Sequence, residues 1–449
     1  MERRPRPNQA LRDLLAEAGM TAAELAAEVN RAGAETGRTL GYDRSAVAHW
    51  LAGTRPRAAV LGLVTEALSR RLGREVTLRE TGLEITAGAT ADVTAAPDER
   101  PGPVSAVRDP GRTHGEPVYA RDLPVPEHSA PVVLRGPLGG PDDRIERFEV
   151  EAAEAMALVF HDADASFGGG RGRRALASYL TADLGPKLHR PAAPALRRRL
   201  MRVAAQLAYL CAFMHFDDHA HGRAQRYYHG ALRIAAANNS LLDRAITLRG
   251  MSVQACQLGH VRQAVDLATA AADTVTGPAV HRAFVQGQLA VAHALDGRVG
   301  DAARALGTAE RLLDRSPDPA SAVSVTGRYH QGSLLRHESA VREILGDPEG
   351  ALRTLRVAEH HRPSGERRSR AVVLADLAVL QLRAGRLNEA VETGYRFLDD
   401  YPHLMSGRAD KALGDLRALL RPHARHPAAR ALLLHSARVV PGGGPRRGR

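Results

Sequence analysis

The stretch GHVRQAVDLATAA, residues 259–271, is one of four related segments that together decide the fold of this chain. The others are GRVGDAARALGTAE from Gly297, GDPEGALRTLRVAE from Gly346 and GRLNEAVETGYRFL from Gly385. Each begins with a glycine, which turns the chain easily, and has an alanine five residues later and a small or apolar residue seven beyond that. Positions seven apart lie on one face of a helix. The pattern therefore predicts the second helix of an antiparallel pair, packed closely against its neighbours.

An earlier copy, in which His219 replaces the glycine, extends the series. The leading alanines are then 40, 38, 49 and 39 residues apart, at Ala224, Ala264, Ala302, Ala351 and Ala390, and the second positions are Ala231, Ala271, Ala309, Ala358 and Phe397. Stacked helix pairs form a superhelix in which each pair contacts its neighbours. The series resembles the tetratricopeptide repeat, with a longer period and with an insertion predicted at residues 315–325. The alternative is an alanine-rich helical bundle without true repeats.

Composition and periodicity divide the chain of 449 residues into four parts and predict an all-α protein. Residues 1–86 form a compact helical block, and residues 144–438 hold the tetratricopeptide-like helical repeats. Between them, residues 87–143 carry ten prolines and one aromatic residue, Tyr119, which predicts a disordered linker. Residues 439–449, ending PGGGPRRGR, are predicted to be a disordered basic tail.

The helical block contains the stretch YDRSAVAHWLAGTRPR, residues 42–57, whose two faces differ in character. On a helix, Val47 and Trp50 fall on one side with Leu51 and Thr54, so the only tryptophan of the chain points inward. Small and hydrogen-bonding side chains fall on the opposite side. Thr21, with Glu24 three residues later, predicts a capped helix before this one.

A helix with such an outward face suits the major groove of DNA, where bulky residues near its start would block approach. Ser45 and His49 are predicted to meet base edges, and Ala48 a thymine methyl group. Arg44 is predicted to reach guanine or phosphate. Arg55 and Arg57, beyond Gly53, are predicted to contact the DNA backbone.

At these residues the block resembles the helix-turn-helix family typified by phage repressors. The resemblance rests on LAAEV at 25–29, SAVAHWLAGTRP at 45–56 and ALSRRLG at 67–73. The segment NRAGAETGRTL, residues 30–40, is longer than the usual motif allows, so it lengthens the second helix or its turn. With PRPNQALRDLLAEAG and the repeats, the chain also resembles transcriptional regulators of Streptomyces and related actinobacteria. That resemblance implies a cytoplasmic regulator that binds double-stranded DNA.

The net charge of +12 favours an anionic partner, although nearly all of it comes from arginine, which GC-rich coding also produces. The two cysteines, Cys211 and Cys256, exclude a disulfide framework or a cysteine zinc site and fit a reducing compartment. The N-terminus lacks the apolar run of a signal peptide, and no segment is long enough to span a membrane. A cytoplasmic protein is therefore expected.

The partners expected are DNA, a second copy of the chain, and a peptide, small molecule or protein sensed by the repeats, with no membrane. At the level of the fold only, the architecture resembles peptide-sensing regulators of Gram-positive bacteria. No cofactor, metal or catalytic residue is predicted, since no Ser-His-Asp or paired-carboxylate pattern stands out. Two alternatives stay open: a helical-repeat scaffold that does not bind DNA, and a metal-dependent enzyme using His215, Asp218 and His219. The run GGGRGRR from Gly168 lacks the residues of a phosphate loop and predicts a connection between helices.

Overall fold

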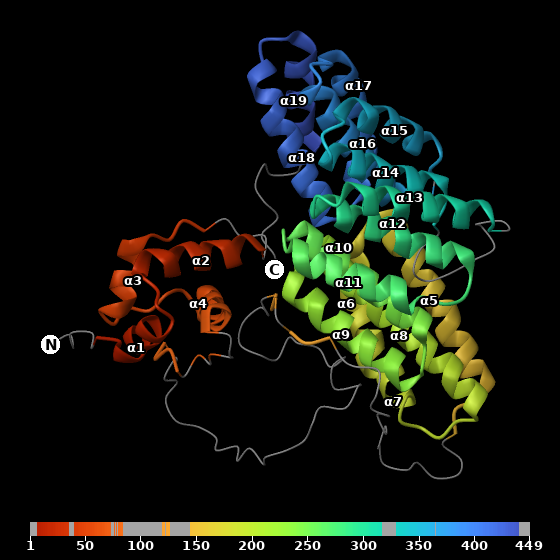
Figure 1. Cartoon of the computed structure of the whole chain (residues 1–449), viewed down its shortest axis with the longest axis horizontal. Helices are drawn as coiled ribbons and strands as arrows, with labels where there is room; N and C mark the ends of the chain where they lie inside the picture. The colour runs from red at the N-terminus through yellow and green to blue at the C-terminus, as the bar shows by residue number, and fades with distance from the viewer. Residues whose placement is uncertain are drawn as a thin grey trace.

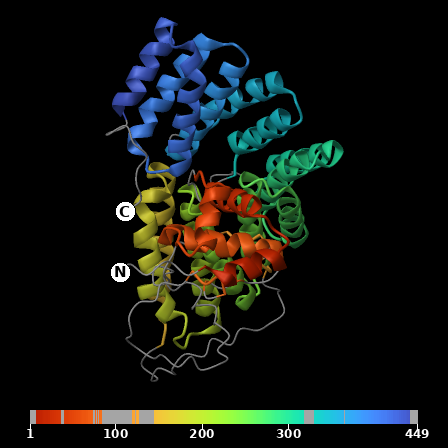
Figure 2. The ribbon, with the colours of Figure 1, turned by 90° about the vertical axis from the view of Figure 1, so that its left-hand side faces the viewer.

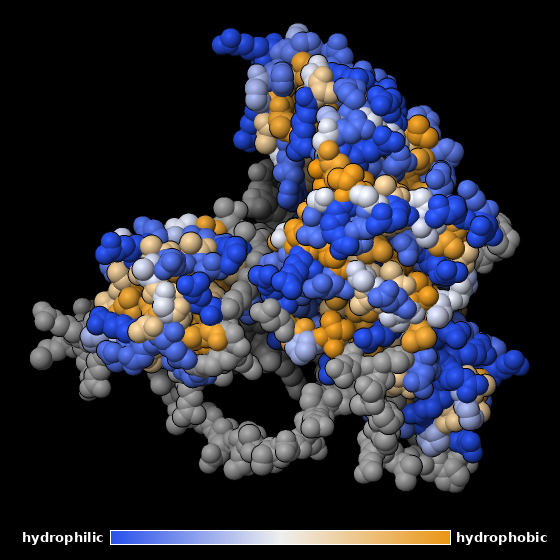
Figure 3. Space-filling model, in the orientation of Figure 1, coloured by the Kyte–Doolittle hydropathy of each residue, from blue (hydrophilic) through white to orange (hydrophobic). Residues whose placement is uncertain are grey.

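The computed structural model describes residues 7–35, 40–72, 76, 78, 80–83, 119–121, 123–125, 144–316, 329–363 and 365–439 (Figure 1). Every regular element within these residues is helical, which confirms the predicted all-α fold. No helix among them has the length and apolar character needed to cross a membrane. On the face drawn in Figure 3, hydrophilic residues predominate over the repeat helices, with smaller apolar patches between them. The predicted basic tail after residue 439 lies outside the described residues.

The N-terminal block consists of four helices, α1 (Gln9–Glu17), α2 (Ala22–Glu35), α3 (Arg44–Leu51) and α4 (Ala58–Leu72). Side chains cap these helices where the sequence predicts starts: the backbone N–H of Glu24 donates to Thr21, and the N–H of Thr21 donates back to the Glu24 carboxylate. Asp43 accepts from the N–H of Ala46 at the start of α3. Apolar residues from all four helices share one core, which includes Leu11, Leu25, Val47, Trp50 and Leu68.

Six antiparallel helix pairs follow in the repeat region. They are α8 (Pro194–Asp217) with α9 (His221–Ala237), α10 (Leu241–Gln257) with α11 (Val261–Thr274), α12 (Ala279–Leu295) with α13 (Val299–Asp314), α14 (Gln331–Ile344) with α15 (Pro348–His360), α16 (Arg367–Arg383) with α17 (Leu387–Asp400), and α18 (Gly407–Leu420) with α19 (Pro427–Val439). Short 3₁₀ turns, Tyr401–His403 and Arg421–His423, follow α17 and α18. The last pair lacks the glycine–alanine signature, and the sequence pattern does not mark it.

The turns between paired helices have the conformation that the repeat pattern predicts. Gly259, Gly297, Gly346 and Gly385 all have positive φ, and His219, at the equivalent place in the earlier copy, has φ +59°. The alanines and Phe397 at the two signature positions are all fully buried between helices. The longest spacing corresponds to the connection between α13 and α14, of which residues 317–328 lie outside the described residues. The repeat prediction is therefore confirmed, and with it the reason for the alanines.

Helices α5 (Arg147–Phe167), α6 (Gly169–Ser178) and α7 (Gly185–Lys187), with a π-helical turn at Tyr179–Leu184, precede the repeats. Figure 2 shows α5, in yellow, extending toward the blue C-terminal helices, and α5 packs against both α8 and α16. Of the run GGGRGRR, predicted to connect two helices, only Gly168 lies between α5 and α6, and the other residues form the start of α6. A Cβ on Gly169 would lie 2.7 Å from the backbone of Met214, and one on Gly170 would lie 2.8 Å from the Met405 carbonyl. The superhelix is therefore closed by contacts of α5 and α6 with α16 and with the segment just before α18 (Gly407–Leu420).

Candidate functional site

The six residues predicted to contact DNA are all exposed in the N-terminal block. Four of them share the outer face of α3: Arg44, Ser45, Ala48 and His49. The other two, Arg55 and Arg57, follow the turn at Gly53, which has φ +104° and lies just beyond the end of the helix. Val47 and Trp50 are buried on the opposite face, as predicted. Thr54 differs from the prediction, because α3 ends at Leu51 and the Thr54 side chain is exposed beyond it.

Helix α3 is held in place through the segment that precedes it. The Asn30 amide of α2 donates to the Tyr42 carbonyl at 2.7 Å and accepts from the Tyr42 N–H at 2.9 Å. The Tyr42 ring then packs edge-on against Trp50, with ring centroids 5.2 Å apart. The long segment after Asn30 extends α2 through Glu35, and residues 36–39 lie outside the described residues. The extension therefore leaves α3 fixed to α2 by both backbone and core contacts.

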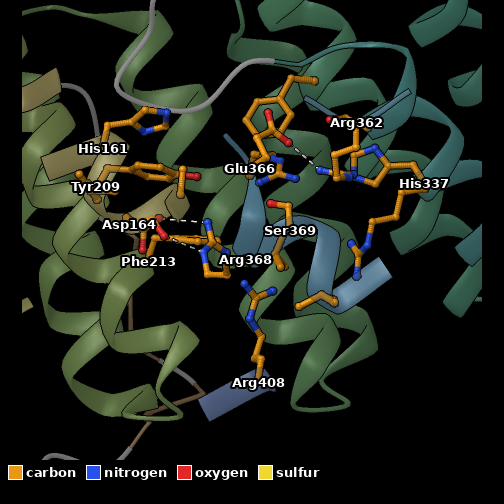
Figure 4. Close-up of a pocket in the computed structure, with 18 residues that line it drawn as sticks. His161, Asp164, Tyr209, Phe213, His337, Arg362, Glu366, Arg368, Ser369 and Arg408 are labelled. Atoms are coloured by element: carbon orange, nitrogen blue, oxygen red, sulfur yellow. Dashed lines mark hydrogen bonds and ion pairs between the residues drawn. The ribbon is translucent and has the colours of Figure 1, made fainter. Parts of the chain in front are cut away.

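A pocket of about 200 Å³ lies inside the repeat superhelix (Figure 4). Its lining comes from α5, from the first helix of every pair, and from Arg362 and Glu366 in the connection between α15 and α16, with none from a second helix. The walls combine aromatic rings with charged groups, and the charged or titratable side chains are His161, Asp164, Tyr209, Arg249, Arg336, His337, Arg362, Glu366, Arg368 and Arg408. These residues span nearly 250 positions of the chain, so no local motif in the sequence marks them. The residues that line the pocket can therefore be assigned only from the structure.

A buried ion network forms part of the lining of the pocket. Arg368 lies 3.0 Å from the Asp164 carboxylate, and Figure 4 shows this pair with Arg408 beside it. Arg408 lies 2.8 Å from Asp217, which is fully buried and also lies 3.7 Å from Arg368. The guanidiniums of Arg368 and Arg408 are within 4.8 and 5.3 Å of the Phe213 ring centre. This network connects α5, α8, α16 and α18, and it supplements the backbone contacts that close the superhelix.

The cluster around His215 has a structural place at the junction of α8 and α9. The His215 ring stacks on Tyr227 at 5.2 Å, and burial lowers the pKa of His215 to about 3. Asp218 pairs with Arg173, and His219 forms the left-handed turn between the helices. Across the residues that the structure describes, no three His, Cys, Asp or Glu side chains come together as a metal would require. The geometry gives the metal-enzyme alternative no ligand set there.

Part of the predicted linker is docked on the repeats, which corrects the expectation of disorder for those residues. Tyr119 is 1% exposed, and its hydroxyl donates to the Gln263 side chain of α11 at 2.8 Å while its ring stacks on His260. The Gln225 amide of α9 bonds both the N–H and the carbonyl of Ala120, at 2.8 and 2.6 Å. Gln263 also donates to the carbonyl of Arg121. The signal in the sequence was Tyr119 itself, the one aromatic residue of the linker.

Replacing Tyr119 with alanine is expected to release this segment from α9 and α11. Truncating a buried aromatic side chain typically costs about 3 to 5 kcal/mol, so the local opening equilibrium should rise well beyond tenfold. Hydrogen exchange of the Ala120 amide measures that opening. Leu123→Ala serves as the control, because Leu123 is exposed in the same segment and its loss should leave exchange unchanged. Unaltered protection in the Tyr119 variant would show that the glutamine contacts alone hold the segment.

Residues 11–84 match the family described as SP15 N-terminal domain, which covers the N-terminal block and less than half of the chain. Among curated proteins, no match is found. Among solved structures, the chain is similar to a Signal Transduction ATPase with Numerous Domains (STAND) protein with a tetratricopeptide repeat sensor from Pyrococcus horikoshii. The identity is 13% and the TM-score 0.39, over 66% of this chain and 40% of the other. The match therefore spans less than half of that protein's length.

Proposed function

We propose that this chain is a cytoplasmic DNA-binding regulator of transcription whose repeats sense a signal and mediate homodimerisation. The observation that carries the proposal is the outer face of α3, where small and hydrogen-bonding side chains are exposed and two arginines follow the helix end. A recognition helix needs such a face at its start, while phosphate contacts from flanking arginines fix its register. The resemblance to Streptomyces-type helix-turn-helix regulators supports the same function.

The fixing of α3 to its core gives further support. Base readout depends on a recognition helix whose orientation is set within the domain. The Asn30 amide and the Tyr42–Trp50 contact hold the start and the back of α3, so the exposed face has a defined direction. Two half-sites read by two copies of the block would raise affinity, which is why a homodimer is proposed.

The test is the binding of the full-length protein to duplex DNA, first to sequences selected from a random pool and then across a salt series. Arg57→Ala should weaken binding to all sequences alike and lower the salt slope by about one, because one phosphate contact is lost. Ser45→Ala and His49→Ala should instead reduce discrimination by roughly 1 to 3 kcal/mol per lost base contact.

Arg311→Ala is the matched control, since it removes the same charge from an exposed site on α13 of the repeats. It should leave both the salt slope and the sequence preference unchanged. If Arg57→Ala altered sequence preference while the Ser45 and His49 variants did not, the docking of α3 would be wrong. The regulator function would be refuted by two results together: the full-length protein selects no sequence, and Arg57→Ala lowers its affinity for duplex DNA no more than Arg311→Ala does. A scaffold role would then be favoured.

A further inference from the structure

We infer that the pocket inside the repeats binds a small organic anion, a carboxylate or phosphate monoester with an apolar body, and that Arg249 receives its charge. The inference rests on the proposed function in one respect: it names the chemical class of the signal that the repeats sense. The occupant, its charge and its size follow from the pocket alone.

The lining of the pocket carries an excess of positive charge. Five arginines face it, against two carboxylates, Asp164 and Glu366. An unbalanced charge in a partly desolvated site is costly, and a bound anion of opposite charge offsets that cost. The excess therefore favours an anionic ligand over a neutral or cationic one.

Four of the five arginines already have acidic partners. The pairs are Arg368 with Asp164, Arg408 with Asp217, Arg362 with Glu366, and Arg336 with Asp376. Arg249 is the exception, because none of the acidic side chains that the structure describes forms an ion pair with it. It lies on α10 and is one of the residues that line the pocket.

Arg249 is 8% exposed, and the aromatic side chains around its guanidinium do not neutralise its positive charge. The group lies 3.6 Å from the ring centre of Phe284 and beside Tyr209, while its Nε has no hydrogen-bond partner among the residues that the structure describes. Burial lowers the pKa of Arg249, but arginine stays charged at neutral pH. A buried, charged fork with free donors is the arrangement that binds a carboxylate or phosphate through two hydrogen bonds.

The rest of the lining suits the apolar body of such a ligand. Leu210, Phe213, Val253 and Phe284 line the pocket beside the charged groups. The volume of about 200 Å³ admits a small molecule and excludes a nucleic-acid duplex or a whole helix. Phe284 contributes to both parts, since it lines the pocket and its ring face lies against the Arg249 guanidinium.

The first measurement is the melting temperature of the full-length protein with phenylacetate, phenyl phosphate or the neutral phenylacetamide. Each is titrated at constant ionic strength, so that general salt effects cancel. At about ten times the dissociation constant, a ligand of the folded state raises the Tm by a few degrees. We expect a saturable rise with one or both anions and none with phenylacetamide, and the anion with the stronger effect identifies the headgroup.

The second measurement compares two substitutions in the same pocket. Arg249→Met removes an unpaired buried charge, so the Tm of the ligand-free protein should stay the same or rise, while the response to the anion is lost. Arg368→Met removes the partner of buried carboxylates, so the Tm of the ligand-free protein should fall. The contrast separates a ligand-binding arginine from one that holds the fold.

Three outcomes would overturn the inference: no shift with either anion, an equal shift with phenylacetamide, or an anion response that survives in Arg249→Met. A large fall in Tm for ligand-free Arg249→Met would also overturn it, because Arg249 would then be a structural contact. The proposed function is tested separately by DNA binding. A protein that binds the anions through Arg249 but does not bind DNA would refute the regulator function and support the pocket inference. A protein that binds DNA but shows no anion response through Arg249 would refute the pocket inference and leave the regulator function supported.

Discussion

Trp50→Ala is expected to unfold the N-terminal block while the repeats stay folded. Trp50 is 4% exposed in a small core that is built mainly from four short helices, and it also packs against Tyr42. Removing a buried tryptophan typically costs about 3 to 5 kcal/mol. A domain of this size has roughly that much stability in total, so the loss is sufficient to unfold it. DNA binding should disappear with the block.

Hydrogen exchange of the amides of α1 to α4 measures the effect directly, because the variant has no tryptophan left to report by fluorescence. In the unsubstituted protein, emission should be blue-shifted and protected from quenchers. Arg44→Ala is the control, since this exposed neighbour should change stability by less than about 0.5 kcal/mol. Protection of the block in Trp50→Ala equal to that in the control would contradict the role given to Trp50.

Asp217→Ala is expected to produce the largest loss of stability in the repeats. Its buried carboxylate accepts from Arg408 at 2.9 Å and lies near Arg368, so its removal leaves two guanidiniums without their shared counter-charge. Breaking a buried pair in this way costs about 3 to 5 kcal/mol. The contacts that close the superhelix, between α5 and α6 at one end and α16 and α18 at the other, should loosen first.

Chemical unfolding followed by circular dichroism gives the free energy, and hydrogen exchange in α6 and α18 shows where the opening occurs. The matched control is Asp415→Ala, which breaks the exposed pair with Lys411 one turn away on α18. Such surface pairs contribute only about 0.3 to 0.5 kcal/mol. Equal losses for the two variants would show that the buried network does not hold the closure.

The contribution of Asp217 to the pH dependence of stability has a definite sign. Burial raises the pKa of Asp217, but the charges of Arg408 and Arg368 outweigh it, so the pKa in the folded protein is lowered. A lowered pKa in the folded state contributes stability above the unfolded-state pKa of about 3.9, and that contribution is lost as the pH falls through the folded value. The contribution of Asp217 should therefore be intact at neutral pH and disappear only in acid.

Several features of the fold followed from the sequence because each depends on neighbours in the chain. Helix starts are set by side chains three residues away, as at Thr21 and Glu24, and helix faces by the spacing of Val47 and Trp50. The repeat turns were predictable for the same reason, including His219, which replaces a glycine and still takes the left-handed conformation. The α3 residues proposed for DNA contact were found by the same local periodicity, and Arg55 and Arg57 by their place after the helix end.

Other features were decided by tertiary structure, because they depend on residues far apart in the chain. Nothing near Arg249 in the sequence tells that Tyr209 and Phe284 will surround it, or that Asp164 will meet Arg368. The docking of Tyr119 likewise depends on two glutamines more than a hundred residues away. Local propensity sets helices and turns, whereas a pocket and its charge balance arise only when the helices pack. The sequence alone therefore determined an all-α repeat protein with an exposed α3 face. The packing of its helices decided where the buried charges lie, and it left Arg249, alone among the five pocket arginines, without an ion pair to an acidic side chain in the described part of the chain.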